Sequence, residues 1–295
     1  MDDVRLAVCH PDGAVRAGVA VRLRGATVEY CNDLLLGPPR GCNAILLAGP
    51  VSPAEVERIL SAGVHVVLIA DRCRPGDGIE GLYAAARTFS VQFAAVNPDR
   101  YLPSRQLIKK QLAGPLGEPG LIRLHRWEPP STDRAGGPAA LPDPLLRDID
   151  LALWLAGRRP NRVYAVEQKA AGAPGRFVQV HLGFAGGGMA LLDYSSRLPP
   201  GDGYQSLSVI AARGAAYADD HQNAQLLYRG GNAQAVRTDE HAGQFAAIAQ
   251  EFVDALRAGQ NLAAGVGEWR DVFAVADAVR ELLASGQAVE VEAPT

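Results

Sequence analysis

Short apolar runs alternate with segments of helical periodicity through the first third of the chain, and this alternation is the feature that most constrains the fold. Several of the runs are apolar throughout, which is typical of strands covered on both faces. Strands that alternate with helices predict βα units and a parallel sheet. The expected strands are Val4–Cys9, Ala26–Cys31, Asn43–Gly49, Val64–Ala70 and Val91–Asn97, and the expected helices cover 14–25, 52–63 and 79–88.

One of these helices carries local signals at both ends. Ser52 stands at the N-cap position, Pro53 follows at the first helical position, and Glu55 is placed to complete a capping box. Gly63 suits the end of the helix. These signals predict the boundaries of this helix from local sequence alone.

The rhythm changes between Asn97 and Pro103, where we place a domain boundary at residues 98/99. A helix, a strand, a Pro/Gly-rich loop and a second helix follow, and the pattern is then mostly period two from Val163 to about Val236. Two helices with apolar stripes finish the chain. The predicted fold class is α/β plus α+β, with a doubly wound domain over 1–98 and a largely antiparallel sheet backed by helices over 99–295. Whether the last helices pack back on the first domain stays open.

The net charge and the hydropathy of the chain argue against nucleic-acid and membrane partners. The net charge is −3, which gives no basic footprint for nucleic acid. No apolar run approaches the roughly 18 residues needed to cross a bilayer, and the acidic N-terminus lacks the apolar run of a signal peptide. We therefore expect a cytoplasmic protein with no membrane or nucleic-acid partner. Its four cysteines match no zinc or redox spacing, and we read them as buried thiols in a reducing compartment.

Five segments, in order along nearly the whole chain, resemble the glucose–fructose oxidoreductase and inositol dehydrogenase family, Gfo/Idh/MocA. They are AILLAGPVSPAEVERILSAGVHVVLIADR, NPDRYLPSRQLIKKQLAGPLGEPGLIRLHRW, DPLLRDIDLALWLAG, QEFVDALRAGQ and WRDVFAVADAVRELLASGQAVEV. The resemblance implies a Rossmann-like first domain, here shortened, and an NAD(P)-dependent oxidoreductase ancestry. Fold alone does not carry function, so the site residues have to be compared one by one.

The turn after the first strand departs from the family pattern. Family members place glycines there, so that backbone amides hold the pyrophosphate. Here the turn reads CHPDGAVR, in which Pro11 has no amide donor and Asp12 adds a negative charge. This turn is poorly suited to binding a dinucleotide, and His10 and Gly13 are the candidate cofactor contacts that remain in it.

The spacing before the third strand is also short, with room for about one βα unit where the family has two. Part of the adenosine platform is therefore expected to be missing. Glu29 could still meet a ribose hydroxyl, with a solvated edge charge as the alternative.

The two proton-transfer groups that the resemblance implies are missing. The Glu-Lys-Pro motif falls on Ile69-Ala70-Asp71, or one residue later, and no lysine occurs before Lys109. The Asp-x-Gly-x-His motif becomes Asp143-Pro144-Leu145-Leu146-Arg147, with arginine in place of the imidazole. A guanidinium does not lose its proton at usable pH. Asp143 survives, although a role as helix N-cap would also explain it.

These departures leave several site predictions. Candidate acid/base groups are Asp71, Asp143 and Tyr194. Arg100, Arg126, Asp143 and Arg147 could line the cleft between the domains and hold a small anionic or sugar-like ligand, although these arginines could instead be solvated or paired with Asp148 and Asp150. No metal site is expected, because the cluster Asp219-Asp220-His221 lacks further converging ligands.

The leading hypothesis is a family member that has lost cofactor binding and catalysis and acts as a binding or structural subunit, so that no cofactor is expected. It would form a homo-oligomer through the C-terminal sheet, or a hetero-oligomer with an active paralogue. The alternative is an oxidoreductase of a sugar, polyol or related hydroxy compound, with NAD or NADP as cofactor and atypical acid/base residues. A cofactor-free hydrolase or lyase is a third reading.

Overall fold

The computed structural model contains two compact units. The first comprises Met1–Leu102 and His241–Trp269, and the second comprises Pro103–Glu240 and Arg270–Thr295. The described residues are 3–31, 39–49, 51–69, 78–130, 141–168, 175–219, 224–229, 232–237, 240–262 and 266–285.

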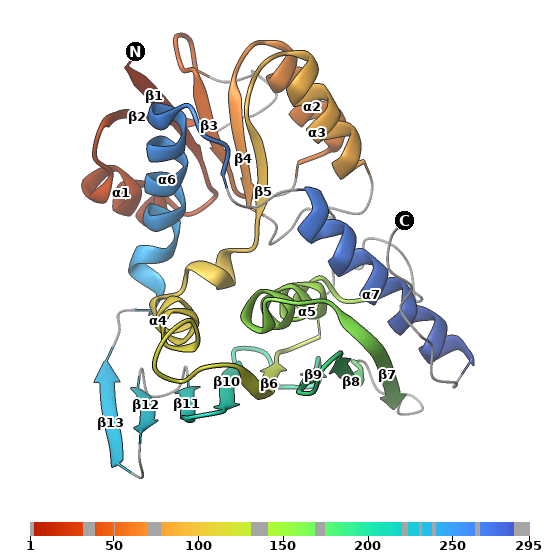
Figure 1. Cartoon of the computed structure of the whole chain (residues 1–295). Helices are drawn as coiled ribbons and strands as arrows, with labels where there is room; N and C mark the ends of the chain where they lie inside the picture. The colour runs from red at the N-terminus through yellow and green to blue at the C-terminus, as the bar shows by residue number, and fades with distance from the viewer. Residues whose placement is uncertain are drawn as a thin grey trace. The chain divides into compact units, whose positions relative to one another are not determined.

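A five-stranded parallel sheet forms the centre of the first unit, in the order β2-β1-β3-β4-β5 (Figure 1). The strands β1, β3, β4 and β5 are mostly buried, as their apolar sequences predict, whereas the edge strand β2 is partly exposed. The strands are β1 (Val4–Cys9), β2 (Ala26–Cys31), β3 (Ala44–Leu47), β4 (His65–Ile69) and β5 (Phe93–Val96).

Helices cover both faces of this sheet. One face packs on α1 and α6 through a cluster that joins Val19 and Phe252 to the strands, and α2 and α3 lie together over the other. The helices are α1 (Gly13–Arg22), α2 (Pro53–Ser61), α3 (Ile79–Thr88) and α6 (Glu240–Ala258), and the short 3-10 helix η2 (Pro98–Tyr101) follows β5. The capping box at Ser52 and Glu55 is present as predicted.

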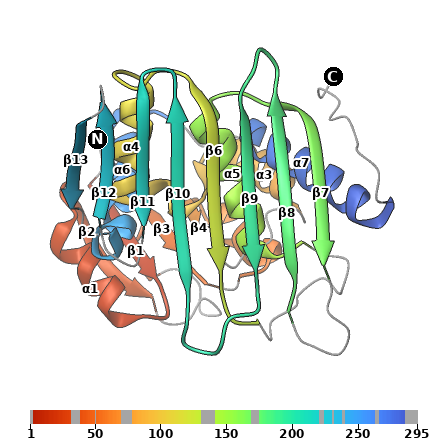
Figure 2. The ribbon, with the colours of Figure 1, turned by 90° about the horizontal axis from the view of Figure 1, so that it is seen from below.

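An eight-stranded mixed sheet forms the second unit, in the order β13-β12-β11-β10-β6-β9-β8-β7 (Figure 2). All neighbours pair antiparallel except β6 and β9, which are parallel. The strands are β6 (Pro119–Trp127), β7 (Pro160–Gln168), β8 (Phe177–Phe184), β9 (Met189–Ser195), β10 (Tyr204–Ala211), β11 (Gly214–Asp219), β12 (Ala224–Arg229) and β13 (Asn232–Arg237).

One face of the eight-stranded sheet is covered by helices, and α5 (Asp143–Ala156) packs on β6 and β9. In Figure 2 the strands lie in front, with α4 (Pro103–Leu112) and α5 behind them. The last helix, α7 (Val266–Ser285), contributes its first turn to the first unit and its remainder to the second. The predicted fold class, doubly wound domain plus largely antiparallel sheet with helices, is confirmed.

One predicted boundary is wrong in detail. The N-cap position of α5 is Pro142, which has extended backbone angles and makes no side-chain cap bond. Asp143 is already helical, so the helix begins one residue earlier than a cap at Asp143 would require. A carboxylate in the first turn still interacts favourably with the helix dipole.

Candidate functional site

The turn between β1 and α1 is held together by its own side chains. The backbone N–H of Asp12 donates to Nδ1 of His10 at 2.9 Å, and the N–H of Ala14 donates to the carboxylate of Asp12 at 2.8 Å. Arg16 donates to the carbonyl of His10, and the ring of His10 packs edge-on against Phe245. Two of the amides that could face a phosphate are therefore used within the turn itself.

Gly13 begins α1 with nothing closer than the flexible Arg16 side chain, at 3.5 Å from a Cβ built on it. It therefore does not mark a close approach of two backbone segments. The predicted cofactor residues His10 and Gly13 lie in the same turn, which is closed by the Asp12 cap.

Glu29, the other predicted cofactor contact, is ion-paired with Arg5 on the same sheet. Its carboxylate accepts a hydrogen bond from Nη2 of Arg5 at 2.7 Å, across the neighbouring strands β1 and β2. This contact is the pairing of opposite charges that adjacent strands favour. A ribose hydroxyl would have to compete with Arg5 for it.

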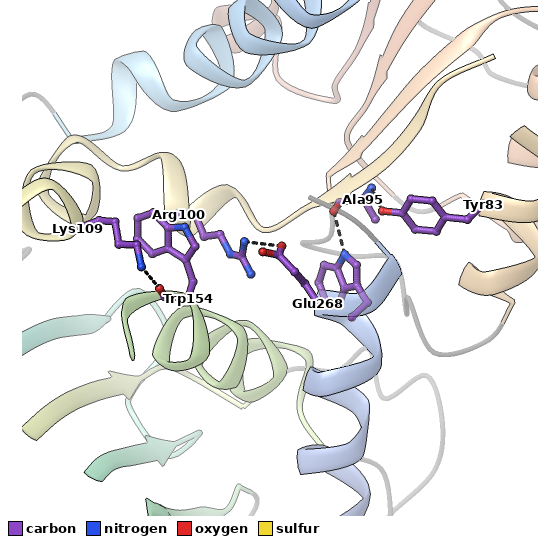
Figure 3. A network of polar contacts seen from close by, with 7 residues as sticks. Tyr83, Ala95, Arg100, Lys109, Trp154 and Glu268 are labelled. Atoms are coloured by element: carbon purple, nitrogen blue, oxygen red, sulfur yellow. Dashed lines mark hydrogen bonds and ion pairs between the residues drawn. The ribbon is translucent and has the colours of Figure 1, made fainter. Parts of the chain in front are cut away.

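Arg100 also has a partner inside the first unit. Its guanidinium and Oε2 of Glu268 are 2.8 Å apart, and the two side chains point toward one another in Figure 3. Close by, Nε1 of Trp269 donates to the carbonyl of Ala95 at 2.9 Å, while the N–H of Ala95 donates to the hydroxyl of Tyr83 at 3.4 Å. Burial raises the pKa of Tyr83 to about 12, so this hydroxyl stays protonated.

In the second unit, a buried ion pair joins Arg126 to Asp148. Nε of Arg126 lies 3.0 Å and 2.9 Å from the two carboxylate oxygens, and Nη2 lies 2.6 Å from Oδ1. Both residues are buried, at 8% and 2% exposure. Arg126 therefore adopts the paired state that the sequence left open as an alternative to ligand binding, and α5 is fixed to β6 by it.

Tyr194 is buried at the end of β9 and donates its hydroxyl proton to Oε1 of Glu128 at 2.8 Å. Burial first, and then the Glu128 carboxylate, raise the pKa of Tyr194 well above its usual range. A phenol in this state holds its proton and suits hydrogen bonding better than proton abstraction.

Asp143 and Arg147 lie one turn apart on α5, both half-buried, as the sequence motif requires. Of the residues aligned with the Glu-Lys-Pro motif, Ile69 ends β4, and Asp71 and the others lie outside the described residues. Most of Asp219-Asp220-His221 also lies outside them. Among the residues that the structure describes, no group of three or more His, Cys, Asp or Glu is arranged to hold a metal ion.

Lys109, the first lysine in the chain, also has a structural contact. Its ammonium donates to the carbonyl of Trp154 near the end of α5 and lies 5.3 Å from the centre of the indole ring (Figure 3). Cations are favoured at the carbonyl end of a helix.

A polar hollow that sequence reasoning missed lies on the face of the eight-stranded sheet turned away from α5. It has a volume of about 150 Å³, and Nδ1 of His125 lies 3.2 Å from a carboxylate oxygen of Asp193. Its lining residues are Arg123, His125, Gln179, His181, Leu191, Leu192 and Asp193. The period-two pattern places Arg123 and His125 on one face, but the pairing of β6 with β9, and of β9 with β8, cannot be read from local sequence.

Comparison with known proteins gives matches at the level of structure only. No family model matches the sequence, and no curated protein does. An oxidoreductase from Agrobacterium radiobacter, solved in complex with NAD+, L-tartaric acid and magnesium, is 15% identical with a TM-score of 0.78 over 98% of this chain and 99% of that one. A UDP-N-acetylglucosamine 3-dehydrogenase from Acidithiobacillus ferrooxidans is 21% identical, with a TM-score of 0.75 over 96% and 98%. A putative myo-inositol dehydrogenase from Sinorhizobium meliloti is 17% identical, with a TM-score of 0.72 over 98% and 100%.

The chain has the Gfo/Idh/MocA fold. The resemblance drawn from five weak sequence segments is thus confirmed at the level of fold. Matches at this identity show the fold. Among the described helices, none is long and apolar enough to cross a membrane.

Proposed function

We propose that this chain no longer binds the dinucleotide cofactor that other proteins of its fold bind. We propose further that it acts as a binding or structural subunit. The observation that carries the proposal is the turn after β1. The amides of Asp12 and Ala14 donate to His10 and to the Asp12 carboxylate, and Pro11 has no amide to offer. A pyrophosphate would have to displace these contacts and approach a carboxylate of like charge.

The missing proton-transfer groups support the same proposal. The chain has no lysine before Lys109, and Arg147 stands where the family motif has histidine. Tyr194 holds its proton, and Arg126 is neutralised by Asp148. None of these groups is suited to take a proton from a substrate hydroxyl near neutral pH.

A second copy of this chain is the partner that we propose, through the outer face of the eight-stranded sheet. We define this outer face by its large exposed side chains, which lie between 36% and 50% exposed: Trp127, Tyr164, Val166, Phe177, Met189, Ile210 and Tyr217. Apolar exposure of this extent on one sheet is typical of an interaction surface. The polar hollow within the outer face holds both Arg123 and Asp193, so a two-fold pairing can place opposite charges against each other.

Titration with NADH and with NADPH tests the loss of cofactor binding. We expect no saturable change in nicotinamide fluorescence up to millimolar concentration, with an active dehydrogenase of the same fold as the positive control. Micromolar binding by this chain, together with hydride transfer to a sugar or polyol, would overturn the proposal.

The second candidate function is an NAD(P)-dependent oxidoreductase with an atypical cofactor grip. The observation that favours it is the whole-chain likeness to solved oxidoreductases, several of which were solved with NAD+, NAD or NADH bound. Asp71, Asp143 and Tyr194 are its candidate acid/base groups, and Arg147 is the residue to test for an anionic substrate. Native mass spectrometry of the purified protein discriminates the two functions, because a resident dinucleotide adds its own mass to the chain.

A further inference from the structure

Two cysteines end neighbouring strands of the parallel sheet. Cys9 is the last residue of β1, Cys31 is the last residue of β2, and the two are register partners in the parallel ladder. Register partners on adjacent strands project from the same face, and adjacent strands lie about 4.8 Å apart. A disulfide joins Cα atoms roughly 4.4–6.8 Å apart. The backbone at this position therefore already meets the spacing that a disulfide needs.

The two thiols differ in access to solvent. Cys9 is partly exposed, whereas Cys31 is buried at 4% exposure. A third cysteine, Cys42, is buried at 8% and lies near enough to Cys31 for the two thiols to interact electrostatically. Burial raises the pKa of the Cys42 thiol, which disfavours the reactive thiolate. Access to solvent thus favours Cys9 as the thiol that an oxidant reaches first.

We propose that Cys9 and Cys31 form a reversible disulfide when the protein meets a peroxide. The Cys9 thiolate attacks one peroxide oxygen, the O–O bond breaks, and Cys9 becomes a sulfenic acid. The Cys31 thiolate then attacks the sulfur of Cys9, the S–O bond breaks, and water leaves. In total two thiols lose two electrons and two protons, and hydrogen peroxide becomes two molecules of water. A dithiol reductant reverses the reaction by exchange.

The Cys9–Cys31 disulfide would constrain the β1–α1 turn, which departs from the family pattern. Cys9 directly precedes His10, so the disulfide ties the edge strand β2 to the first residue of the β1–α1 connection. A disulfide that forms reversibly in a reducing compartment is typical of redox sensing. This inference does not depend on whether the turn binds a dinucleotide.

Trypsin separates these cysteines, which makes the linkage directly readable. Cys9 falls in peptide 6–16, Cys31 in peptide 25–40 and Cys42 in peptide 41–58. The folded full-length protein is treated with hydrogen peroxide, remaining thiols are alkylated, and the digest is analysed by mass spectrometry without reduction. We expect a linked pair of peptides 6–16 and 25–40, loss of two of the four thiols, and recovery of all four after a dithiol reductant.

Variants assign the roles. C9S and C31S should each abolish the linked pair, whereas the matched control C42S should form it at the wild-type rate. In C31S, Cys9 should accumulate as sulfenic acid that a dimedone probe captures. A Cys31–Cys42 link, a disulfide between two chains, or four thiols surviving an excess of peroxide would each overturn the proposal, and the wild-type map decides this even if a variant folds poorly.

Discussion

At the scale of single residues, the second unit depends on a charge pair that has been removed from water. Three hydrogen bonds join the Arg126 guanidinium to the Asp148 carboxylate, so each buried charge is neutralised by the other. Removing one partner of such a pair leaves the other uncompensated, which is more damaging than the pair itself is stabilising. The same arginine that the sequence offers as a ligand contact thus has a structural role.

Asp148→Ala should lower the free energy of unfolding by about 3–5 kcal/mol. The double variant Arg126→Met/Asp148→Leu should recover most of that loss, because no charge is then stranded. Urea denaturation of the two variants measures both values. The matched control Glu29→Ala breaks the solvent-exposed pair with Arg5 and should change stability little. Equal losses for Glu29→Ala and Asp148→Ala would contradict the assignment.

A second residue-scale prediction concerns pH. Burial lowers the pKa of His65, and Nδ1 of His65 accepts a hydrogen bond from the N–H of Gln92 at 2.9 Å, which requires the neutral ring. The unfolded chain binds the proton more readily, near the ordinary pKa of about 6.5. The stability that His65 contributes is therefore present above about pH 6.5 and is lost as the pH falls through the folded pKa.

Chemical denaturation at pH 8 and at pH 5 checks this dependence. Wild type should lose stability between the two, and His65→Asn, whose amide oxygen can accept the same bond without titrating, should lose less. An identical pH dependence in both proteins would remove His65 from the explanation.

At the scale of elements, local signals could be predicted and long-range pairings could not. The capping box at Ser52, and the strands Val4–Cys9 and Ala26–Cys31, were predictable because caps and apolar patterns act within a few residues. The contact of His125 with Asp193 spans 68 residues and depends on β6 lying parallel to β9. The cap at Asp143 was misplaced by one residue, because extended backbone at Pro142 shifts the helix start.

The start of α1 gives a prediction at this scale. The Asp12 side chain accepts from the N–H of Ala14 and caps the helix. Asp12→Ala should cost about 1 kcal/mol of stability, whereas Asp12→Asn keeps the acceptor and should cost much less. Thermal unfolding compares them. If the carboxylate alone repels a dinucleotide, Asp12→Asn would also gain NADH binding, and continued absence of binding would assign the block to the closed turn.

At the scale of the whole molecule, the outer face of the eight-stranded sheet sets the expected assembly. We expect a dimer by light scattering, which Met189→Asp combined with Ile210→Asp should convert to a monomer. Val21→Asp is the matched control, because Val21 is 85% exposed on α1 and lies outside this sheet. If the wild-type protein is a monomer, the proposed homodimer is wrong, and a different chain would have to be the partner.

The core of the first unit contains Phe252 and Ile248 from α6, which follow Leu102 by well over a hundred positions. During synthesis the ribosome delivers these residues only after most of the second unit has emerged. Until translation is nearly complete, the N-terminal segment therefore has α1 but not α6 to cover one apolar face of its strands. A fragment released at Leu102 should remain incompletely folded, and chaperones are expected to attend the nascent chain through this interval.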